Sequence, residues 1–262
     1  MDYETILYET SDDHVATLTL NRPDKLNSFN RRMLQEFAQV WSAIRIDPAV
    51  HTVVLRANGD RAFSSGLDVT DPRARAESDD GIPFNDLDPS YFLGPKANRV
   101  WKPVICAIHG MAAGGAFYWI NECDIVICSD DAQFFDPHVT YGMTSALEPI
   151  GLRYRIPFGE VMRWALMGLD ERMSASRALE IGMVSEVVSR RDLWNRAHEI
   201  AAIIADKPSV ATQGTVRAVW GSLDQGRTQA MDAGLSFVQL GKPLGGEAAA
   251  RQEGRRPQPR IR

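Results

Sequence analysis

The sequence predicts an α/β fold built around a largely parallel sheet. Residues 15–20 alternate and are rich in Val, Thr and Leu, which is typical of a strand. Residues 33–44 carry apolar side chains at helical spacing, and residues 51–56 form a β-branched run. The same strand–helix–strand order returns over residues 104–128. Repeated βαβ units favour parallel strands.

Each element has its own signal. The first helix is indicated by a stripe that ends at Asp47-Pro48 and consists of Met33, Leu34, Phe37, Val40, Trp41 and Ile44. In the second unit we expect a strand at 104–108, a helix at 116–121 and a strand at 124–128. Residues 70–90 are crowded with Asp, Arg and Pro, which predicts a long surface loop. Such a loop either covers a binding site or is a solvated insertion.

The last part of the chain is expected to be helical. An apolar stripe over residues 193–204 ends at Lys207-Pro208, and further helical periodicity follows over residues 216–240. We therefore expect a core over residues 1–200 and a helical region over residues 201–262.

Composition excludes several classes of protein. The 262 residues suffice for one large domain or a core with a smaller appendage. With 44% hydrophobic and 24% charged residues, the chain is not expected to be disordered, collagen-like or a coiled coil. The formal charge of −5 offers no global attraction for nucleic acid or an anionic membrane. Any anionic ligand must be bound locally.

The cysteines and the N-terminus predict a cytoplasmic protein. Cys106, Cys123 and Cys128 lack metal-ligand spacing and lie in apolar surroundings, as reduced core thiols do. The N-terminus has neither the basic start nor the apolar run of a signal peptide. The uncharged run 104–121 is interrupted by His109 and several glycines, so we expect a buried strand, turn and helix rather than membrane insertion.

Two glycine-containing turns are candidates for a functional site. Residues 61–68 form a small-residue turn after a strand, and residues 109–116 contain a glycine pair that opens a helix. Unpaired N–H groups at a helix start can bind an anion or a developing oxyanion. Either turn alone is better explained by tight packing, but together they can cradle one carbonyl oxygen.

These motifs resemble the crotonase superfamily, also called the enoyl-CoA hydratase/isomerase family, over nearly the whole chain. The matching segments are Asn21-Arg22-Pro23 with Lys25 and Asn27, the turns 63–68 and 110–115, Lys102-Pro103-Val104, Cys123-Asp124-Ile125, residues 134–137 and residues 253–257. The resemblance implies a crotonase-type spiral of ββα units followed by a helical C-terminal oligomerisation region. It also implies homotrimers or hexamers.

The resemblance further implies an acyl-CoA substrate, with coenzyme A as part of the substrate and no other cofactor or metal. The backbone N–H groups of Leu67 and Gly115 correspond to an oxyanion hole that stabilises a thioester enolate. The backbone at Ser65, Gly66 and Asp68 corresponds to the contact with the CoA adenine. Lys25 corresponds to a residue near the CoA phosphates, although it is equally explained as a solvated surface lysine.

The sequence departs from the family pattern at both positions where its hydratases carry a glutamate. Tyr118 occupies the first position and His138, directly after Pro137, occupies the second. The sequence therefore predicts His138 as the acid/base group, because imidazole titrates near neutral pH. Glu148 either orients His138 or is a first-turn glutamate favoured by the helix dipole. Tyr118 either donates a hydrogen bond to substrate or fills space, and Glu122 is expected to be structural.

The first functional hypothesis is an acyl-CoA enzyme of the hydratase/isomerase type, with His138 as acid/base. One alternative is a non-catalytic acyl-CoA binding protein that has lost both glutamates. Another is a β-diketone hydrolase that cleaves carbon–carbon bonds with a His138/Glu148 pair, although the acid of those enzymes aligns nearer to Leu147. The arginines at the C-terminus either meet CoA phosphates or form a solvated end.

Overall fold

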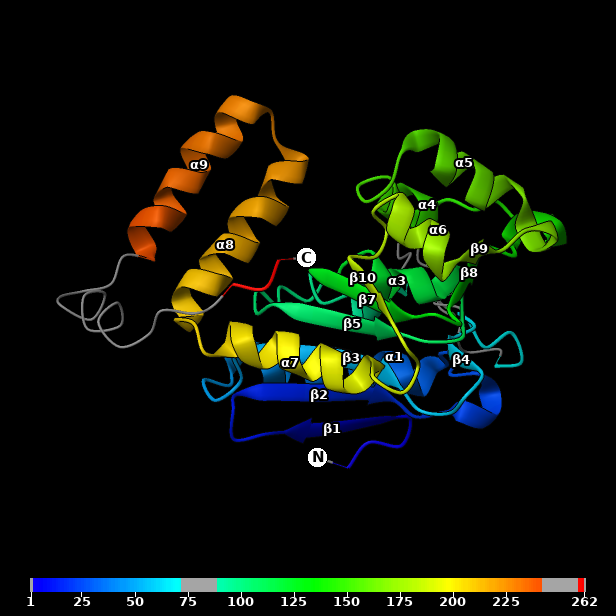
Figure 1. Cartoon of the computed structure of the whole chain (residues 1–262), viewed down its shortest axis with the longest axis horizontal. Coiled ribbons are helices and arrows are strands. Elements are labelled where there is room, and N and C mark those ends of the chain that lie inside the picture. The colour runs from blue at the N-terminus through cyan, green and yellow to red at the C-terminus, as the bar shows by residue number, and fades with distance from the viewer. Residues whose placement is uncertain (1, 72–88, 242–258, 262) are drawn as a thin grey trace, which may run out of the picture. The chain divides into compact units, whose positions relative to one another are not determined.

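The computed structural model describes residues 2–71, 89–241 and 259–261 (Figure 1). The chain divides into two compact units, Met1–Ser209 and Val210–Arg262. Residue 200, where the sequence suggests a boundary, lies within helix α7 (Leu193–Ala205). This helix belongs to the first unit because it packs on that unit's sheet. Most of the loop expected at residues 70–90, and most of the arginine-rich tail, fall outside the described residues.

Two sheets form the framework of the first unit. The larger contains, in spatial order, β1 (Ile6–Thr10), β2 (Val15–Leu20), β3 (Thr52–Ala57), β5 (Val104–Ile108), β7 (Ile125–Ser129) and β10 (Glu186–Val188). Only the β1–β2 pairing is antiparallel among these. The smaller contains β4 (Ala62–Ser64), β6 (Met111–Ala113), β8 (Gln133–Phe135) and β9 (Met173–Ser174), with β9 antiparallel to β8.

The chain alternates between the two sheets and so winds as a spiral. In the chain, strands β3, β5 and β7 of the large sheet lead to strands β4, β6 and β8 of the small sheet, respectively. This confirms the α/β fold and the crotonase-type spiral of ββα units. The short strands β4, β6 and β8 were not predicted individually, because three residues are too few to show a period.

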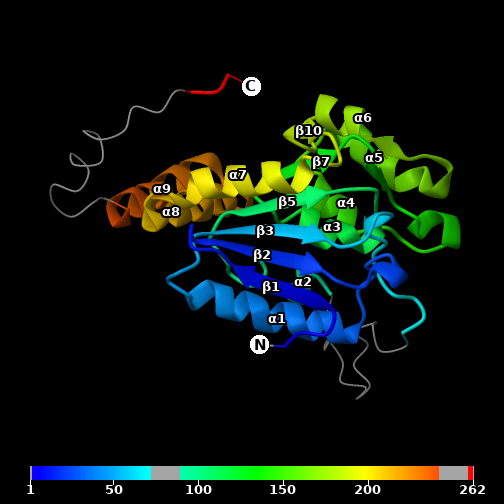
Figure 2. The ribbon, with the colours of Figure 1, turned by 60° about the horizontal axis from the view of Figure 1, so that its bottom comes forward.

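Two long helices cover opposite faces of the large sheet (Figure 2). Helix α1 (Arg31–Ile46) begins at Asn30, whose side chain accepts the N–H of Met33 at 3.0 Å. Helix α7 presents Leu193, Ala197, Ala201 and Ala205 to the strands at i,i+4 spacing, and the small side chains of the three alanines allow close approach. Both helices were predicted close to their observed bounds.

Shorter helices connect these elements in the first unit. They are η1 (Pro23–Lys25), α2 (Ser90–Leu93), η2 (Gly114–Ala116), α3 (Phe117–Ile120), η3 (His138–Tyr141), α4 (Leu147–Leu152), α5 (Phe158–Leu166), η4 (Gly168–Asp170) and α6 (Ala175–Glu180). The expected helix at 116–121 thus begins as a 3-10 turn. None of the described helices is both long and apolar enough to cross a membrane.

The second unit contains a pair of helices. The periodicity expected over residues 216–240 is divided between α8 (Ser209–Gly221) and α9 (Arg227–Leu240), which are separated by η5 (Ser222–Asp224). None of the described residues of α8 and α9 is buried. Many of their exposed side chains are apolar: Val210, Val219, Met231, Leu235, Val238 and Leu240.

All three cysteines are free and buried. Burial raises the pKa of Cys106 and raises that of Cys128 to about 12. The thiols of Cys106 and Cys128 therefore stay protonated at neutral pH, as expected of core residues.

Candidate active site

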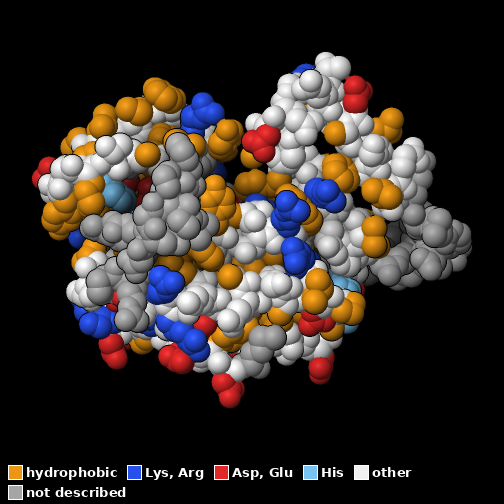
Figure 3. All heavy atoms as spheres, turned by 180° about the vertical axis from the view of Figure 1, so that it is seen from behind, with side chains coloured by type: hydrophobic (Ala, Val, Ile, Leu, Met, Phe, Trp, Pro, Cys, Tyr) orange, Lys and Arg blue, Asp and Glu red, His pale blue; other side chains and the backbone are white. Residues whose placement is uncertain are grey.

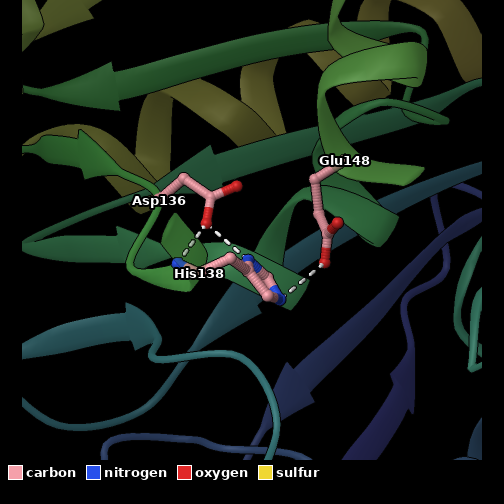
Figure 4. A group of neighbouring side chains, drawn as sticks. All are labelled: Asp136, His138 and Glu148. Carbon is pink, nitrogen blue, oxygen red and sulfur yellow. Dashed lines mark hydrogen bonds and ion pairs between the residues drawn. The ribbon is translucent and has the colours of Figure 1, made fainter. Parts of the chain in front are cut away.

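Asp136, His138 and Glu148 converge from two segments of the chain (Figure 4). Asp136 and His138 lie where β8 leads into η3, and Glu148 lies in the first turn of α4. The Nδ1 atom of His138 is 2.5 Å from Oδ1 of Asp136, and its Nε2 atom is 3.9 Å from Oε1 of Glu148. The imidazole therefore lies between two carboxylates.

Asp136 is fully buried, and its carboxylate accepts hydrogen bonds from His138 and Ser145. Its Oδ1 also accepts the backbone N–H of His138 at 2.9 Å, and its Oδ2 accepts the Ser145 hydroxyl at 2.5 Å. Burial by itself raises the pKa of Asp136, but these hydrogen bonds outweigh it and hold the pKa below its usual value. The hydrogen bond to Asp136 correspondingly raises the pKa of His138.

Glu148 is also buried, with 4% of its surface exposed. Burial raises the pKa of its carboxyl group, although a hydrogen bond from its own backbone N–H, the proximity of His138 and a hydrogen bond with Tyr118 act in the opposite direction. The backbone carbonyl of Glu148 accepts the Asn121 side-chain amide at 2.8 Å, which ties the start of α4 to the end of α3. Tyr118 thus meets Glu148 through a hydrogen bond, and Glu148 faces His138.

The two glycine turns lie against each other. A methyl group at Gly66 would lie 2.8 Å from the Gly115 nitrogen and 2.9 Å from the Ala113 carbonyl oxygen. Gly66 also has φ +84°, a conformation that favours glycine. Only a residue without a side chain allows this approach, so tight packing accounts for the glycine at this position.

Two N–H groups at these turns are available to a ligand. The N–H groups of Ser65, Gly66 and Asp68 donate to Leu26, Ser64 and Phe29 respectively. Within the described part of the chain, by contrast, the N–H groups of Leu67 and Gly115 have no acceptor. The structure therefore brings together two free donors from the two turns.

The second glycine turn lies close to His138 and Tyr118. A methyl group at Gly114 would lie 3.6 Å from the Cε1 atom of His138, and one at Gly115 would lie 3.3 Å from the ring of Tyr118. The turn that carries the Gly115 N–H therefore adjoins the titratable groups.

The residues expected at the CoA-binding position lie in the first glycine turn and next to it. Lys25 is exposed at the end of η1, and the next residue, Leu26, accepts the N–H of Ser65 at 3.0 Å. The Asp68 side chain is buried and forms an ion pair with Arg22 at 2.9 Å, in addition to accepting the Thr70 hydroxyl at 2.6 Å. Its carboxylate thus stabilises the turn.

Sequence reasoning missed Asp136 and Ser145. The carboxylate that hydrogen-bonds the His138 ring is Asp136, whereas Glu148 was considered for that role. A signal was present in the tripeptide Asp136-Pro137-His138, because a carboxylate two residues before a histidine can reach its ring across a turn. Glu122, which was expected to be structural, accepts the backbone N–H groups of Lys96 and Ala97 at 2.6 and 2.8 Å.

The donor set of the cluster fits proton transfer better than metal binding. One ligand atom from each of Asp136, His138 and Glu148 lies within 4.8 Å of the others. However, Asp136 and the Nδ1 atom of His138 are engaged with each other. This leaves Nε2 and Glu148, fewer than the three protein ligands of a typical catalytic zinc site.

Comparisons with known proteins agree with the fold. Residues 10–239 match the model of the enoyl-CoA hydratase/isomerase family. The chain is 31% identical to a short-chain-enoyl-CoA hydratase of Clostridium acetobutylicum, over 90% of this chain and 87% of that protein. It is also 31% identical to a 1,2-epoxyphenylacetyl-CoA isomerase of Escherichia coli, over 92% of this chain and 90% of that protein.

Among solved structures, an enoyl-CoA hydratase/isomerase from Mycobacterium paratuberculosis superposes with a TM-score of 0.86. It is 35% identical, and the match covers 98% of both chains. The family match, these relatives and the spiral fold lead to one conclusion: the chain belongs to the enoyl-CoA hydratase/isomerase family.

Proposed function

We propose that the protein is an acyl-CoA enzyme of the hydratase/isomerase type in which His138 is the principal proton-transfer group. The observation that carries this proposal is the position of His138, whose Nε2 atom is 3.9 Å from Glu148 and whose ring lies next to Gly114 in the second glycine turn. The similar proteins named above act on CoA esters, by hydration in one case and isomerisation in another.

The Leu67 and Gly115 N–H groups supply the oxyanion hole in this proposal. Neither N–H group has a hydrogen-bond acceptor within the described residues. Donors of this kind stabilise the negative charge that develops on a thioester oxygen. One such donor contributes about 3 kcal/mol to transition-state stabilisation.

His138 and Glu148 are proposed to replace the two glutamates of the family's hydratases. Their separation of 3.9 Å exceeds hydrogen-bonding distance, but one oxygen atom about 2.8 Å from each fits beside them. In hydration that oxygen belongs to water. In the reverse reaction it is the hydroxyl oxygen of a 3-hydroxyacyl ester.

During hydration, the His138–Glu148 pair takes up one proton and returns one. The water oxygen bonds to the β-carbon, the π electrons move into the thioester carbonyl, and the water proton goes to Nε2 of His138. The enolate then takes a proton at its α-carbon from the pair, and the carbonyl re-forms. Because the pair gains one proton and returns one, it ends as it began.

A β-diketone hydrolase is the second candidate, favoured by the Asp136–His138 hydrogen bond. A histidine oriented by a carboxylate can activate water for attack on a carbonyl carbon. Such an enzyme would use the same oxyanion donors, but its substrate would be a 1,3-diketone and its product a carboxylic acid.

The decisive experiment combines binding with turnover. Isothermal titration with enoyl-, 3-hydroxyacyl- and 3-ketoacyl-CoA esters measures affinity, and mass spectrometry of the same mixtures and of 1,3-diketones identifies products. Hydration or double-bond migration of a CoA ester supports the proposal. Binding without turnover identifies a non-catalytic acyl-CoA binding protein, and cleavage of diketones without CoA-ester binding identifies a hydrolase.

We also propose assembly into homotrimers or hexamers. Figure 3 shows hydrophobic side chains on the surface over the part that contains α4 and α5. The exposed apolar residues of this region include Tyr141, Leu147, Ile150, Tyr154, Phe158 and Leu166. Exposed apolar patches mark interaction surfaces. Light scattering during size-exclusion chromatography is expected to give three or six times the 29.1 kDa chain mass, and a monomer would refute assembly.

A further inference from the structure

We propose that Asp136, supported by Ser145, is a positioning residue that holds His138 with Nδ1 protonated and Nε2 facing Glu148 as the atom that exchanges protons. This inference rests on the proposed role of His138 as acid/base. It assigns a function to a carboxylate that lies outside the two positions where the family's hydratases carry glutamates.

The geometry fixes both the backbone and the ring of His138. Oδ1 of Asp136 accepts the backbone N–H at 2.9 Å and lies 2.5 Å from Nδ1. Pro137, between the two residues, restricts the backbone further through its own fixed φ angle. A ring flip would move Nδ1 away from Oδ1 and leave a buried carboxylate oxygen with one donor fewer, which is unfavourable.

The contacts of Asp136 decide which tautomer is present. A fully buried carboxylate is stable in its ionised form only when donors surround it, and Ser145 and the His138 backbone supply two. An ionised carboxylate only accepts hydrogen bonds, so Nδ1 of His138 must carry a proton. In the neutral ring Nε2 then has the lone pair, as a general base requires.

The charged groups around His138 favour its protonated form. Asp136 acts through a direct hydrogen bond and Glu148 through its charge, and both raise the pKa of His138 against the effect of burial. Tyr118 of α3 contributes a hydrogen bond to Glu148. Helix α5 also packs against η3, but its charged residues Glu160 and Arg163 pair with Arg177 and Glu171. The imidazolium that forms after proton uptake is therefore stabilised.

The direct test is ¹⁵N NMR of the full-length protein labelled at its five histidines, with His138 assigned by His138→Gln. Above the pKa of His138, we expect the ring shifts of a neutral Nδ1–H tautomer. In Asp136→Asn the amide oxygen can still accept both N–H groups of His138 while the amide nitrogen faces the Ser145 hydroxyl, so we expect the Nδ1–H tautomer to be kept and the pKa to fall because the negative charge is lost. A wild-type ring with its proton on Nε2, or an unchanged His138 pKa in Asp136→Asn, would overturn the inference.

Kinetics provide a second readout. Asp136→Asn is expected to lower kcat by about 100- to 10,000-fold with KM within a few fold, and to move the acidic limb of the pH–rate profile to lower pH. Ser145→Ala, which leaves the carboxylate in place, should shift the His138 pKa in the same direction by less. Asp131→Asn is the matched control, because Asp131 also accepts a nearby serine but is exposed and away from His138.

Failure of this inference can be told apart from failure of the proposed function. The NMR measurement needs no substrate, so it tests the positioning role even if no acyl-CoA is turned over. If Asp136→Asn does not fold, the wild-type tautomer and the Ser145→Ala pKa remain decisive. Conversely, turnover that survives His138→Ala would overturn the proposed function while leaving the tautomer unchanged.

Discussion

The Nε2 atom of His138 and the Oε1 atom of Glu148 lie 3.9 Å apart, although ten residues separate them in the chain. This distance excludes a direct hydrogen bond but allows both groups to contact one oxygen atom. The opposite side of the imidazole is held by Asp136. The ring is therefore hydrogen-bonded on one side and faces the Glu148 carboxylate on the other.

Replacement of His138 tests its role in proton transfer. His138→Ala should lower kcat by about 100- to 10,000-fold and leave acyl-CoA affinity within a few fold, since a general acid/base acts on the chemical step. Steady-state kinetics and isothermal titration measure the two effects. Undiminished kcat in this variant would contradict the assignment.

Removal of the Glu148 carboxylate tests the second member of the pair. Glu148→Gln keeps the shape and is expected to reduce kcat by at least about 100-fold if the carboxylate holds or transfers a proton. Tyr118→Phe removes only the hydrogen bond to Glu148, so its effect should be smaller. Equal kcat for wild type and Glu148→Gln would show that Glu148 is structural.

The close approach of the two turns predicts a specific effect of Gly66→Ala. The new methyl group would lie 2.8 Å from the Gly115 nitrogen, so one turn must move and the oxyanion donors separate. We expect kcat to fall by about 100- to 1,000-fold, as for loss of one oxyanion donor.

The control is Gly182→Ala, at a glycine with a similar φ of +81° but nothing within 4 Å. It carries the same backbone strain, about 1–2 kcal/mol, without the collision. Thermal unfolding should show a loss of stability in both variants, and activity should fall only in Gly66→Ala. A parallel loss of activity in both would assign the effect to strain alone.

Lys25 is expected to contribute to binding rather than catalysis. Lys25→Ala should weaken binding of a CoA ester by roughly 2- to 5-fold at low salt and less at high salt, because an exposed charge pair contributes at most about 1 kcal/mol and is screened. Lys207→Ala, which removes another exposed lysine, is the control. Titrations at two salt concentrations measure the difference, and equal affinities for the two variants would exclude Lys25 from the phosphate contact.

The Asp136–His138 pair also predicts how stability depends on pH. The raised pKa of His138 gives stability that is fully present below about pH 6.5 and is lost as the pH rises through its folded value. The lowered pKa of Asp136 gives stability that is present above about pH 4 and is lost as the pH falls through its folded value.

Urea unfolding of wild type and His138→Gln across this range measures the contribution of the pair. The stability difference between the two proteins should be largest between about pH 4 and 6.5 and should shrink toward alkaline pH. A difference that grows as the pH rises would contradict the direction of the His138 shift.

The sequence by itself determined the main elements of this protein and its family. The strands at 15–20, 104–108 and 124–128 and the helices that begin near Arg31 and Leu193 are recorded in local periodicity, because each buries one face in a continuous pattern. The two glycine turns were also visible, since residues without side chains at a strand end are a local feature of the chain.

Only the tertiary structure decided which of the site's side chains contact one another and at what distance. No spacing rule gives the distance from Glu148 to His138, which depends on how α4 packs after the η3 turn. The pairing of Asp136 with Ser145 likewise depends on the path of the intervening chain. Hydrogen bonds and pKa shifts are set by distance and burial in space, so His138 could be selected from the sequence as a candidate acid/base residue, whereas its hydrogen-bond partner Asp136 could not.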